Sequence, residues 1–133
     1  MEYLKDFNFT PSEFARFEEI ALQKIYQPEE IIIKEGERDR SLMIITKGKA
    51  KVVIHHNNQP KIVAKLHSGA IIGELNFTIP LHRSADVLAE EETEAIILHY
   101  KELCTLLEND ETIAKKFFHG INLLLIERIK AML

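Results

Sequence analysis

The sequence is poor in the features that mark secreted, membrane-bound and nucleic-acid-coating proteins. Its 133 residues include one cysteine, Cys104, so an internal disulfide is excluded and a reducing compartment fits. No apolar run is long enough to cross a bilayer, and the N-terminus lacks the basic and apolar regions of a secretory signal. Basic residues are fewer than acidic ones, which gives the chain a net charge of −4. We therefore expect a cytoplasmic protein that binds neither nucleic acid nor a membrane directly.

Apolar residues, by contrast, are plentiful enough for one core. They make up 46% of the chain, and the length fits a single domain over residues 1–133. Three kinds of sequence pattern follow one another along the chain. We expect residues 1–28 to be helical, residues 29–99 to be β-structure and residues 100–133 to be helical again.

The first helix has a clear start signal. Thr10 can serve as the N-cap, Pro11 suits the first helical position, and Glu13 stands where a capping box needs its acid. Apolar residues then recur at helical spacing as far as Ile25. Pro28 is predicted to end this helix.

Residues 29–99 contain seven short apolar or β-branched runs, separated by turn signals such as Lys47-Gly48. Many short strands at even spacing predict a sandwich, a roll or a barrel. The runs are EIIIK, LMIITKG, AKVVIHH, KIVAKL, AIIGE, ADVLAE and TEAIILH.

Two helices are predicted after His99, a short one and then a long one with Asp110 or Thr112 as its cap. The long helix has an apolar face wider than one small roll can cover. A second copy of the chain would cover it, so we expect a homodimer through this helix; the alternative is that it packs on its own roll. The apolar residues are Ile113, Phe117, Phe118, Ile121, Leu123, Leu124, Leu125, Ile126, Ile129 and Met132.

One acid and one base stand close together in GAIIGELNFTIPLHRSADV, beside glycine turns. Arginine is a permanent planar cation that offers two parallel N–H groups to phosphate oxygens. A carboxylate suits the hydroxyl of a sugar instead, so Glu74 and Arg83 can hold two parts of one ligand. Gly73 allows close approach of the backbone, and a helix starting there would add N–H donors.

The same segment resembles the phosphate-binding cassette of the cyclic nucleotide-binding domain family, found in catabolite activator proteins and kinase regulatory subunits. Its Gly-Glu-Leu is followed by a short loop and then by Arg-Ser-Ala-x-Val, and EGERDRSLMIITKGKAKVV resembles the family's early strands. The resemblance implies a mainly β fold with flanking helices: a double-stranded β-helix, or jelly-roll-like β-roll, with an N-terminal helix and two C-terminal helices, the last one long.

The resemblance also implies a role for each cassette residue. Glu74 would bind the ribose, Arg83 and Ser84 the phosphate, and backbone amides of the cassette would complete the cradle. The ligand would be cyclic AMP rather than cyclic GMP, by frequency in the family. The full set is Gly73, Glu74, Leu75, Asn76, Arg83, Ser84 and Ala85. Candidates on the long helix for closing over the base are Lys116, His119, Gly120 and Asn122.

Three residues depart from the family pattern. Asn76 replaces a small residue, Pro80 does not directly precede Arg83, and Asp86 stands near that arginine. Strand alternation places Asp86 on the opposite face from Arg83, so we expect it to point away. The alternative is a degenerate roll that serves dimerisation or partner docking, with Arg83 already paired to Asp86 or Glu74.

Enzyme function is not expected. No nucleophile, base and acid stand together in a catalytic pattern, and one cysteine excludes an iron–sulfur centre. A metal-dependent cupin would need His-x-His with a following Glu, so metals and cofactors are not expected either. Family transcription factors carry a DNA-binding module after the long helix. We expect a stand-alone sensor that acts through an effector protein; a piece of a larger chain is the other possibility.

Overall fold

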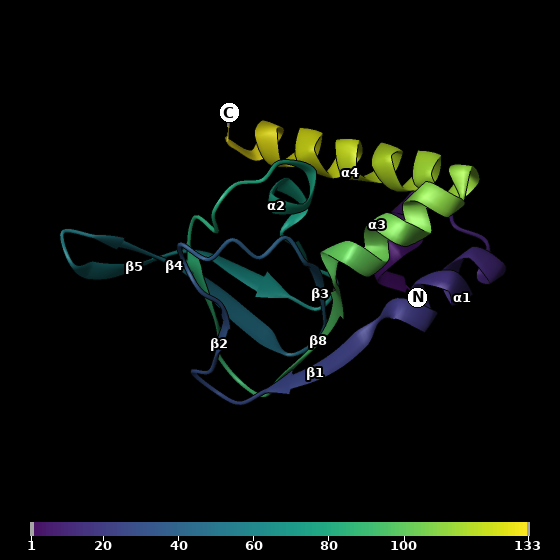
Figure 1. The fold of residues 1–133 in the computed structure, drawn as a ribbon. Helices are drawn as coiled ribbons and strands as arrows, with labels where there is room; N and C mark the ends of the chain where they lie inside the picture. Colours follow the sequence, from purple (N-terminus) through teal and green to yellow (C-terminus); the bar gives the residue numbers. More distant parts are fainter. Residues whose placement is uncertain (1, 133) are drawn as a thin grey trace.

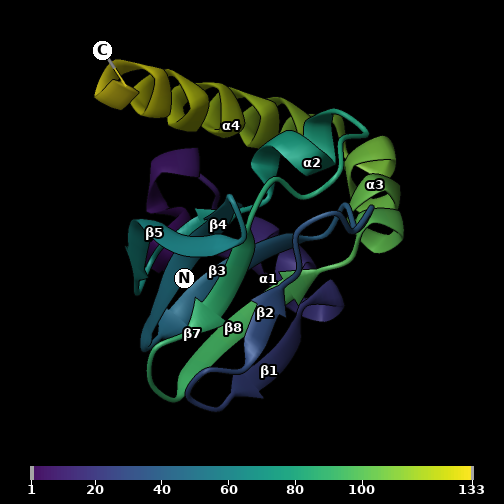
Figure 2. The same ribbon diagram turned by 90° about the vertical axis from the view of Figure 1, so that its left-hand side faces the viewer.

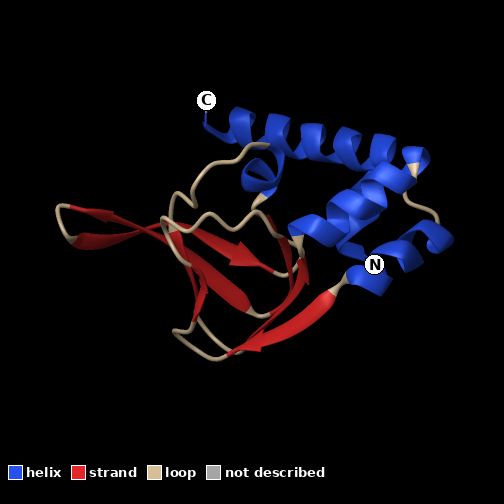
Figure 3. Cartoon of the chain, in the orientation of Figure 1, coloured by secondary structure: helices blue, strands red, loops and turns tan. Residues whose placement is uncertain are grey.

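Two four-stranded antiparallel sheets form the centre of the computed structural model, which describes residues 2–132 (Figures 1 and 3). The predicted β-roll is therefore confirmed. The first sheet has the order β1 (Leu22–Tyr26), β8 (Thr93–Leu98), β3 (Leu42–Lys47) and β6 (Ile71–Ile72). The second has the order β2 (Ile31–Ile33), β7 (Asp86–Ala89), β4 (Lys49–His56) and β5 (Gln59–His67).

The helices gather along one side of the strands (Figure 3). In both Figure 1 and Figure 2 the long last helix passes over the short α2. None of the described helices has the length and apolar character that crossing a membrane requires. The helices are η1 (Glu2–Phe7), α1 (Pro11–Ile20), α2 (Glu74–Thr78), α3 (Tyr100–Asn109) and α4 (Glu111–Met132).

All seven predicted strand runs are strands, but the end of the first helix was predicted wrongly. α1 ends at Ile20, and Leu22–Tyr26 forms β1, which pairs with β8. β1 lies at the edge of its sheet, where Leu22 and Ile25 are exposed and only Tyr26 is buried. Such a strand shows no alternating pattern, and its apolar residues happened to fit helical spacing.

The predicted helix starts are confirmed in atomic detail. The Thr10 side chain accepts a hydrogen bond from the Glu13 N–H, and the Glu13 carboxylate accepts one from the Thr10 N–H at 2.8 Å. Of the two caps proposed for α4, Asp110 is the one used, because its carboxylate accepts from the Ile113 N–H at 3.0 Å.

β3 separates two apolar clusters, because both of its faces are buried. Leu42 and Ile44 pack against the helices, in a cluster that includes Phe17 and Phe117. Met43 and Ile45, which point to the other face, pack in the interior of the roll. This explains why β3 reads as a continuous apolar run rather than an alternating one.

α4 has one buried face and one exposed face. Ile113, Phe117 and Ile121 are buried in the helical cluster, and Leu124 and Leu125 pack against it. A second row of apolar residues is exposed: Phe118, Leu123, Ile126 and Ile129. The predicted Met132 side chain lies outside the described part of the structure.

Candidate ligand-binding site

A cavity of about 380 Å³ lies between α2, the loop that follows α2 and the second sheet. Its wall is mainly apolar on the side of the strands, where Val52, Leu66 and Val87 contribute. The cavity brings together all seven predicted site residues: Gly73, Glu74, Leu75, Asn76, Arg83, Ser84 and Ala85. It also contains a charged residue that was not predicted, Arg128 of α4.

Gly73 allows the backbone at the start of α2 to lie close to the Arg83 side chain. Its φ of 90° lies in the left-handed region, which glycine adopts without a steric penalty. A Cβ at this position would lie 2.8 Å from the Ser41 carbonyl oxygen and would also meet the Arg83 guanidinium. The residue is glycine because both the backbone angle and the space require it.

Arg83 is held from both its backbone and its side chain, and only 4% of its surface is exposed. Its N–H donates to the Glu37 carbonyl and its carbonyl accepts from the Gly36 N–H, each at 2.8 Å. The guanidinium donates to the Ser41 carbonyl at 2.9 Å and lies 3.5 Å from the Asp39 carboxylate. Burial lowers the pKa of Arg83 and Asp39 opposes this shift, so the group remains a cation.

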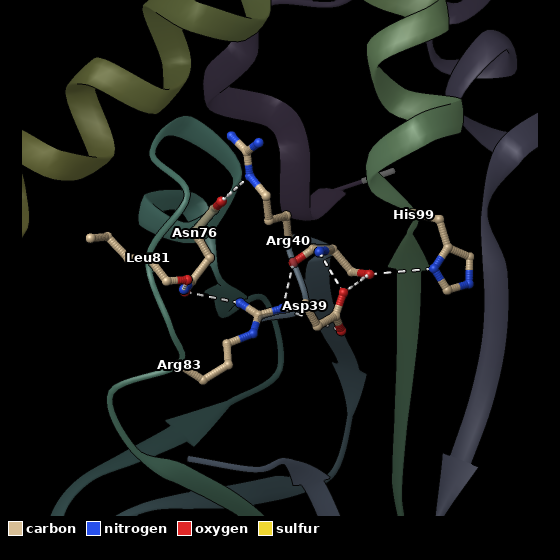
Figure 4. A network of polar contacts seen from close by, with 7 residues as sticks. Asp39, Arg40, Asn76, Leu81, Arg83 and His99 are labelled. Carbon is tan, nitrogen blue, oxygen red and sulfur yellow. Dashed lines mark hydrogen bonds and ion pairs between the residues drawn. The ribbon is translucent and has the colours of Figure 1, made fainter. Parts of the chain in front are cut away.

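Asn76 joins the arginine to the loop after α2 (Figure 4). Its side-chain oxygen accepts from Arg83 at 3.1 Å, and its side-chain nitrogen donates to the Leu81 carbonyl at 2.8 Å. The larger residue is therefore accommodated by two hydrogen bonds. Pro80 is exposed on the same loop.

Asp39 connects Arg83 to the beginning of α3 (Figure 4). One carboxylate oxygen accepts from the Ser41 N–H at 2.9 Å and from the Ser41 hydroxyl at 2.7 Å. That hydroxyl lies 3.3 Å from Nδ1 of His99, the N-cap residue of α3. Burial acts to raise the pKa of Asp39, but the Ser41 hydrogen bonds and the charge of Arg83 outweigh it, so the pKa lies below its ordinary value.

Arg40, the neighbour of Asp39, holds the C-terminal end of α2. Its guanidinium donates to the Asn76 carbonyl at 2.9 Å and to the Phe77 carbonyl at 2.7 Å. It also stacks on the Tyr100 ring, 4.1 Å from the ring centre. The loop at residues 37–41 thus contacts Arg83, α2 and α3 together. Sequence reasoning missed this loop, because arginines in a charged turn are usually solvent-exposed.

Glu74 is the first residue of α2 and only 2% of its surface is exposed. Arg128 of α4 binds it: one guanidinium nitrogen donates to Glu74 Oε1 and another to the Ile71 carbonyl. The second carboxylate oxygen, Oε2, is buried and has no hydrogen-bond partner among the described residues. The pattern that could have revealed Arg128 is its place at the end of the buried stripe of α4, seven positions after Ile121.

Asp86 points away from the cavity, as strand alternation predicted. Its carboxylate accepts from the Glu35 N–H at 2.7 Å and lies 3.9 Å from His55. It therefore does not compete for Arg83.

Ser84, the residue after Arg83, is exposed and lines the cavity.

The four α4 candidates for closing over a base do not line the cavity. Lys116 forms an ion pair with Glu13 of α1 at 2.7 Å. Gly120 is buried against the Phe7 ring, which a Cβ there would strike. His119 and Asn122 are exposed. The α4 residue at the cavity is Arg128 instead.

The arrangement places a buried cation and a buried anion at one small cavity. Arg83 Nε and Glu74 Oε2 both lack a hydrogen-bond partner within residues 2–132. Buried polar atoms without partners are uncommon, and a ligand is one of the explanations for them. A compact anion that also carries a hydroxyl would match this pair. No group of three metal-binding side chains is found in the part of the chain that the structure describes.

Residues 23–110 match the family model described as cyclic nucleotide-binding domain. Over 75 residues the chain is 33% identical to human cGMP-dependent protein kinase 2, an alignment that covers 55% of this chain and 10% of the kinase. The chain thus spans about a tenth of the length of this curated relative.

Two solved structures share the fold. One is a cyclic nucleotide-binding domain from Methylobacillus flagellatus, with a TM-score of 0.89 and 25% identity, over 98% of this chain and 78% of that one. The other is the catabolite activator protein of Thermus thermophilus, with a TM-score of 0.82 and 22% identity, over 99% of this chain and 60% of that one. The family model covers more than half of the sequence, so the chain belongs to the cyclic nucleotide-binding domain family.

Proposed function

We propose that this chain binds a cyclic purine nucleotide in the 380 Å³ cavity and acts as a regulatory module. One observation carries the proposal. All seven cassette residues line this cavity, and its buried arginine and buried glutamate each keep a polar atom that has no hydrogen-bond partner among the described residues.

Each part of the ligand has a partner in the cavity. Arg83 and the exposed hydroxyl of Ser84 are proposed to hold the cyclic phosphate, with the Leu75, Asn76 and Ala85 amides adding donors. Glu74 is proposed to accept a hydrogen bond from the ribose 2′-hydroxyl. The apolar wall of the second sheet suits the face of a purine.

Cyclic AMP is the first ligand to test, and cyclic GMP is the second. Two observations support cyclic GMP as the second candidate ligand. Ser84 offers a hydroxyl next to Arg83, and one relative is named as a cGMP-dependent protein kinase. A hydroxyl in that position would donate to or accept from the guanine ring. The comparison of the two nucleotides is therefore part of the test.

The response to ligand is proposed to travel through the C-terminal helices to a second copy and to an effector protein. α4 carries the exposed apolar residues Phe118, Leu123, Ile126 and Ile129. Exposed apolar residues gathered on one helix are typical of protein–protein contacts. A second copy presenting the same helix would cover this row in an isologous dimer.

A degenerate roll that binds only protein partners is the second candidate. It is favoured by the fact that Arg83 and Glu74 already have partners within the chain. The specific pairings expected for it are wrong, however: Arg83 pairs with Asp39, not with Asp86 or Glu74.

A thermal melt of ligand-free protein with each nucleotide tests the proposal. A ligand that binds only the native state raises the free energy of unfolding by about 2.7 kcal/mol when its concentration is a hundredfold above its dissociation constant. We expect such a rise in melting temperature for the wild type and none for Arg83→Ala. Arg38→Ala is the matched control, because it removes an arginine outside the cavity whose side chain contacts His82 instead. No rise in the wild type with either nucleotide would favour the degenerate roll.

A further inference from the structure

Asn76 is the cavity residue that occupies a donor of Arg83. Its side-chain oxygen accepts a hydrogen bond from Nη1 of Arg83 at 3.1 Å. The other partners of the guanidinium, the Ser41 carbonyl and the Asp39 carboxylate, both lie at Nη2 and do not line the cavity. Nε is therefore the one guanidinium nitrogen without a hydrogen-bond partner among the described residues.

The orientation of the Asn76 amide is fixed from its other end (Figure 4). Its side-chain nitrogen donates to the Leu81 carbonyl at 2.8 Å. Because an amide nitrogen donates and an amide oxygen accepts, this bond keeps the oxygen turned toward Arg83. The backbone carbonyl of Asn76 is also held, since it accepts from Arg40 at 2.9 Å. A fixed acceptor oxygen thus lies beside Nη1 of Arg83.

We propose that Asn76 is a specificity-determining residue: by occupying Nη1 of Arg83, it selects a singly charged phosphodiester over a doubly charged phosphomonoester. This inference rests on the proposed binding of a cyclic nucleotide. It adds the class of ligand that the cavity rejects, the linear nucleoside 5′-monophosphates. It also gives a role to the residue that departs from the small side chain of the family pattern.

The selection follows from the charge and the oxygen count of the two ligand classes. A cyclic phosphodiester has two terminal oxygens and one negative charge. A phosphomonoester has three terminal oxygens and carries close to two charges above its second pKa of about 6. The additional oxygen needs an additional donor, and Nη1 is the donor that Asn76 occupies.

Loss of the Asn76 side chain is expected to affect the two classes differently. It would expose Nη1 to the third oxygen of a monoester, and it would remove an acceptor oxygen that repels an anion. The diester gains little, because Nε of Arg83 and the backbone amides of the cassette already provide its proposed donors. A residue that only supported Arg83 would instead change the affinity for both classes equally.

The experiment is an equilibrium titration of each cyclic nucleotide and its linear counterpart, cyclic AMP with 5′-AMP and cyclic GMP with 5′-GMP. It is run at about pH 8, where the monoester is doubly charged. The proteins are ligand-free wild type, Asn76→Ala, Asn76→Asp and Asn122→Ala. The readout is the dissociation constant of the monoester divided by that of the cyclic nucleotide.

Asn76→Ala is expected to lower this ratio about tenfold, the effect of one charge-assisted hydrogen bond. Asn76→Asp keeps the shape of the side chain and an acceptor, but its negative charge opposes a dianion more than a monoanion, so the ratio should rise. Asn122→Ala removes an exposed asparagine of α4 that does not line the cavity, and it should keep the wild-type ratio.

An unchanged or higher ratio in Asn76→Ala would overturn the inference, as would a lower ratio in Asn76→Asp. If the wild type binds no measurable monoester, the appearance of binding in Asn76→Ala supports the inference and its absence there overturns it. Those results leave the proposed function standing, because the wild type still binds the cyclic nucleotide. A wild type that binds neither cyclic nucleotide would overturn both. If the alanine variant does not fold, Asn76→Ser takes the same expectation, because its hydroxyl is one bond too short to reach Arg83.

Discussion

Single residues decide how closely α2 and the arginine approach each other, and Gly73 is the clearest case. Replacement by alanine would place a Cβ 2.8 Å from the Ser41 carbonyl at a φ of 90°. We expect Gly73→Ala to destabilise the fold by about 2–5 kcal/mol, the sum of a left-handed backbone and a steric overlap. Chemical denaturation measures this loss.

Gly36→Ala is the matched control for that loss. Gly36 has a φ of 87°, and nothing lies within 4 Å of a Cβ built on it. Only the backbone term applies there, about 1–2 kcal/mol. Equal losses in the two variants would show that the space around Gly73 is not the constraint.

Asp39 gives the protein a stability term that depends on pH. Its pKa lies below the ordinary value of 3.8, because the Ser41 hydrogen bonds and the Arg83 charge outweigh its burial. The ionised form therefore stabilises the folded state fully above that value, and the contribution is lost as the pH falls through the lowered pKa. Its side chain is 50% exposed, so solvent screening keeps the term below about 1 kcal/mol.

Asp39→Asn isolates this term. We expect the melting temperature of the wild type to exceed that of the variant at neutral pH, and the difference to shrink below about pH 4. Melts across that range measure it. A difference that stays constant or grows in acid would contradict the assignment.

The sequence predicted the cassette residues but not the groups that surround them. Glu74 and Arg83 were identified because an acid and an arginine beside glycine turns match ligand chemistry. Asp39 and Arg128 lie 44 residues before and 45 after Arg83, and only the folded chain brings them to it or to Glu74. No local pattern records such a pairing, so tertiary structure was needed to find it.

Elements were predicted best where short apolar or β-branched runs lie between turn signals, or where helix caps are explicit. The strands between residues 29 and 99 and both C-terminal helices are where the pattern placed them. β1 was missed because the apolar residues of this edge strand continue the helical spacing of the preceding helix. Pairing with β8 decides its conformation, and that partner is about 70 residues away in the sequence.

The position of α2 depends on the loop at residues 37–41. Arg40 binds two carbonyls at the end of α2 and stacks on Tyr100 of α3. Hydrogen bonds to a charged donor contribute more than neutral ones, so we expect Arg40→Ala to cost about 1–3 kcal/mol of stability. Thermal melts of the ligand-free protein provide the measurement.

Arg40→Lys is the informative companion variant. Lysine keeps the charge but lacks the planar fork that reaches both carbonyls and the aromatic face. We expect it to lose most of the stability that alanine loses. A lysine variant as stable as wild type would indicate that charge alone, not the forked geometry, holds α2.

At the scale of the whole molecule, the exposed row on α4 is proposed to join two copies. Ile126 is 47% exposed in that row. We expect Ile126→Glu to convert a dimer into a monomer while the fold is retained, because a buried unpaired charge opposes association. Sedimentation at several concentrations measures the state. Ile62→Glu on β5, where Ile62 is 51% exposed, is the control; a wild type that is monomeric throughout would contradict the proposed dimer.

The central claim is that one cavity takes a cyclic nucleotide through Arg83 and Glu74. Isothermal titration calorimetry of cyclic AMP and cyclic GMP into refolded, ligand-free protein tests it most directly. The account predicts one site per chain for at least one nucleotide, with binding lost or weakened about tenfold or more in Arg83→Ala, as expected when a charge-assisted hydrogen bond to an anion is removed. No heat of binding with either nucleotide, or equal binding by Arg83→Ala, would contradict it.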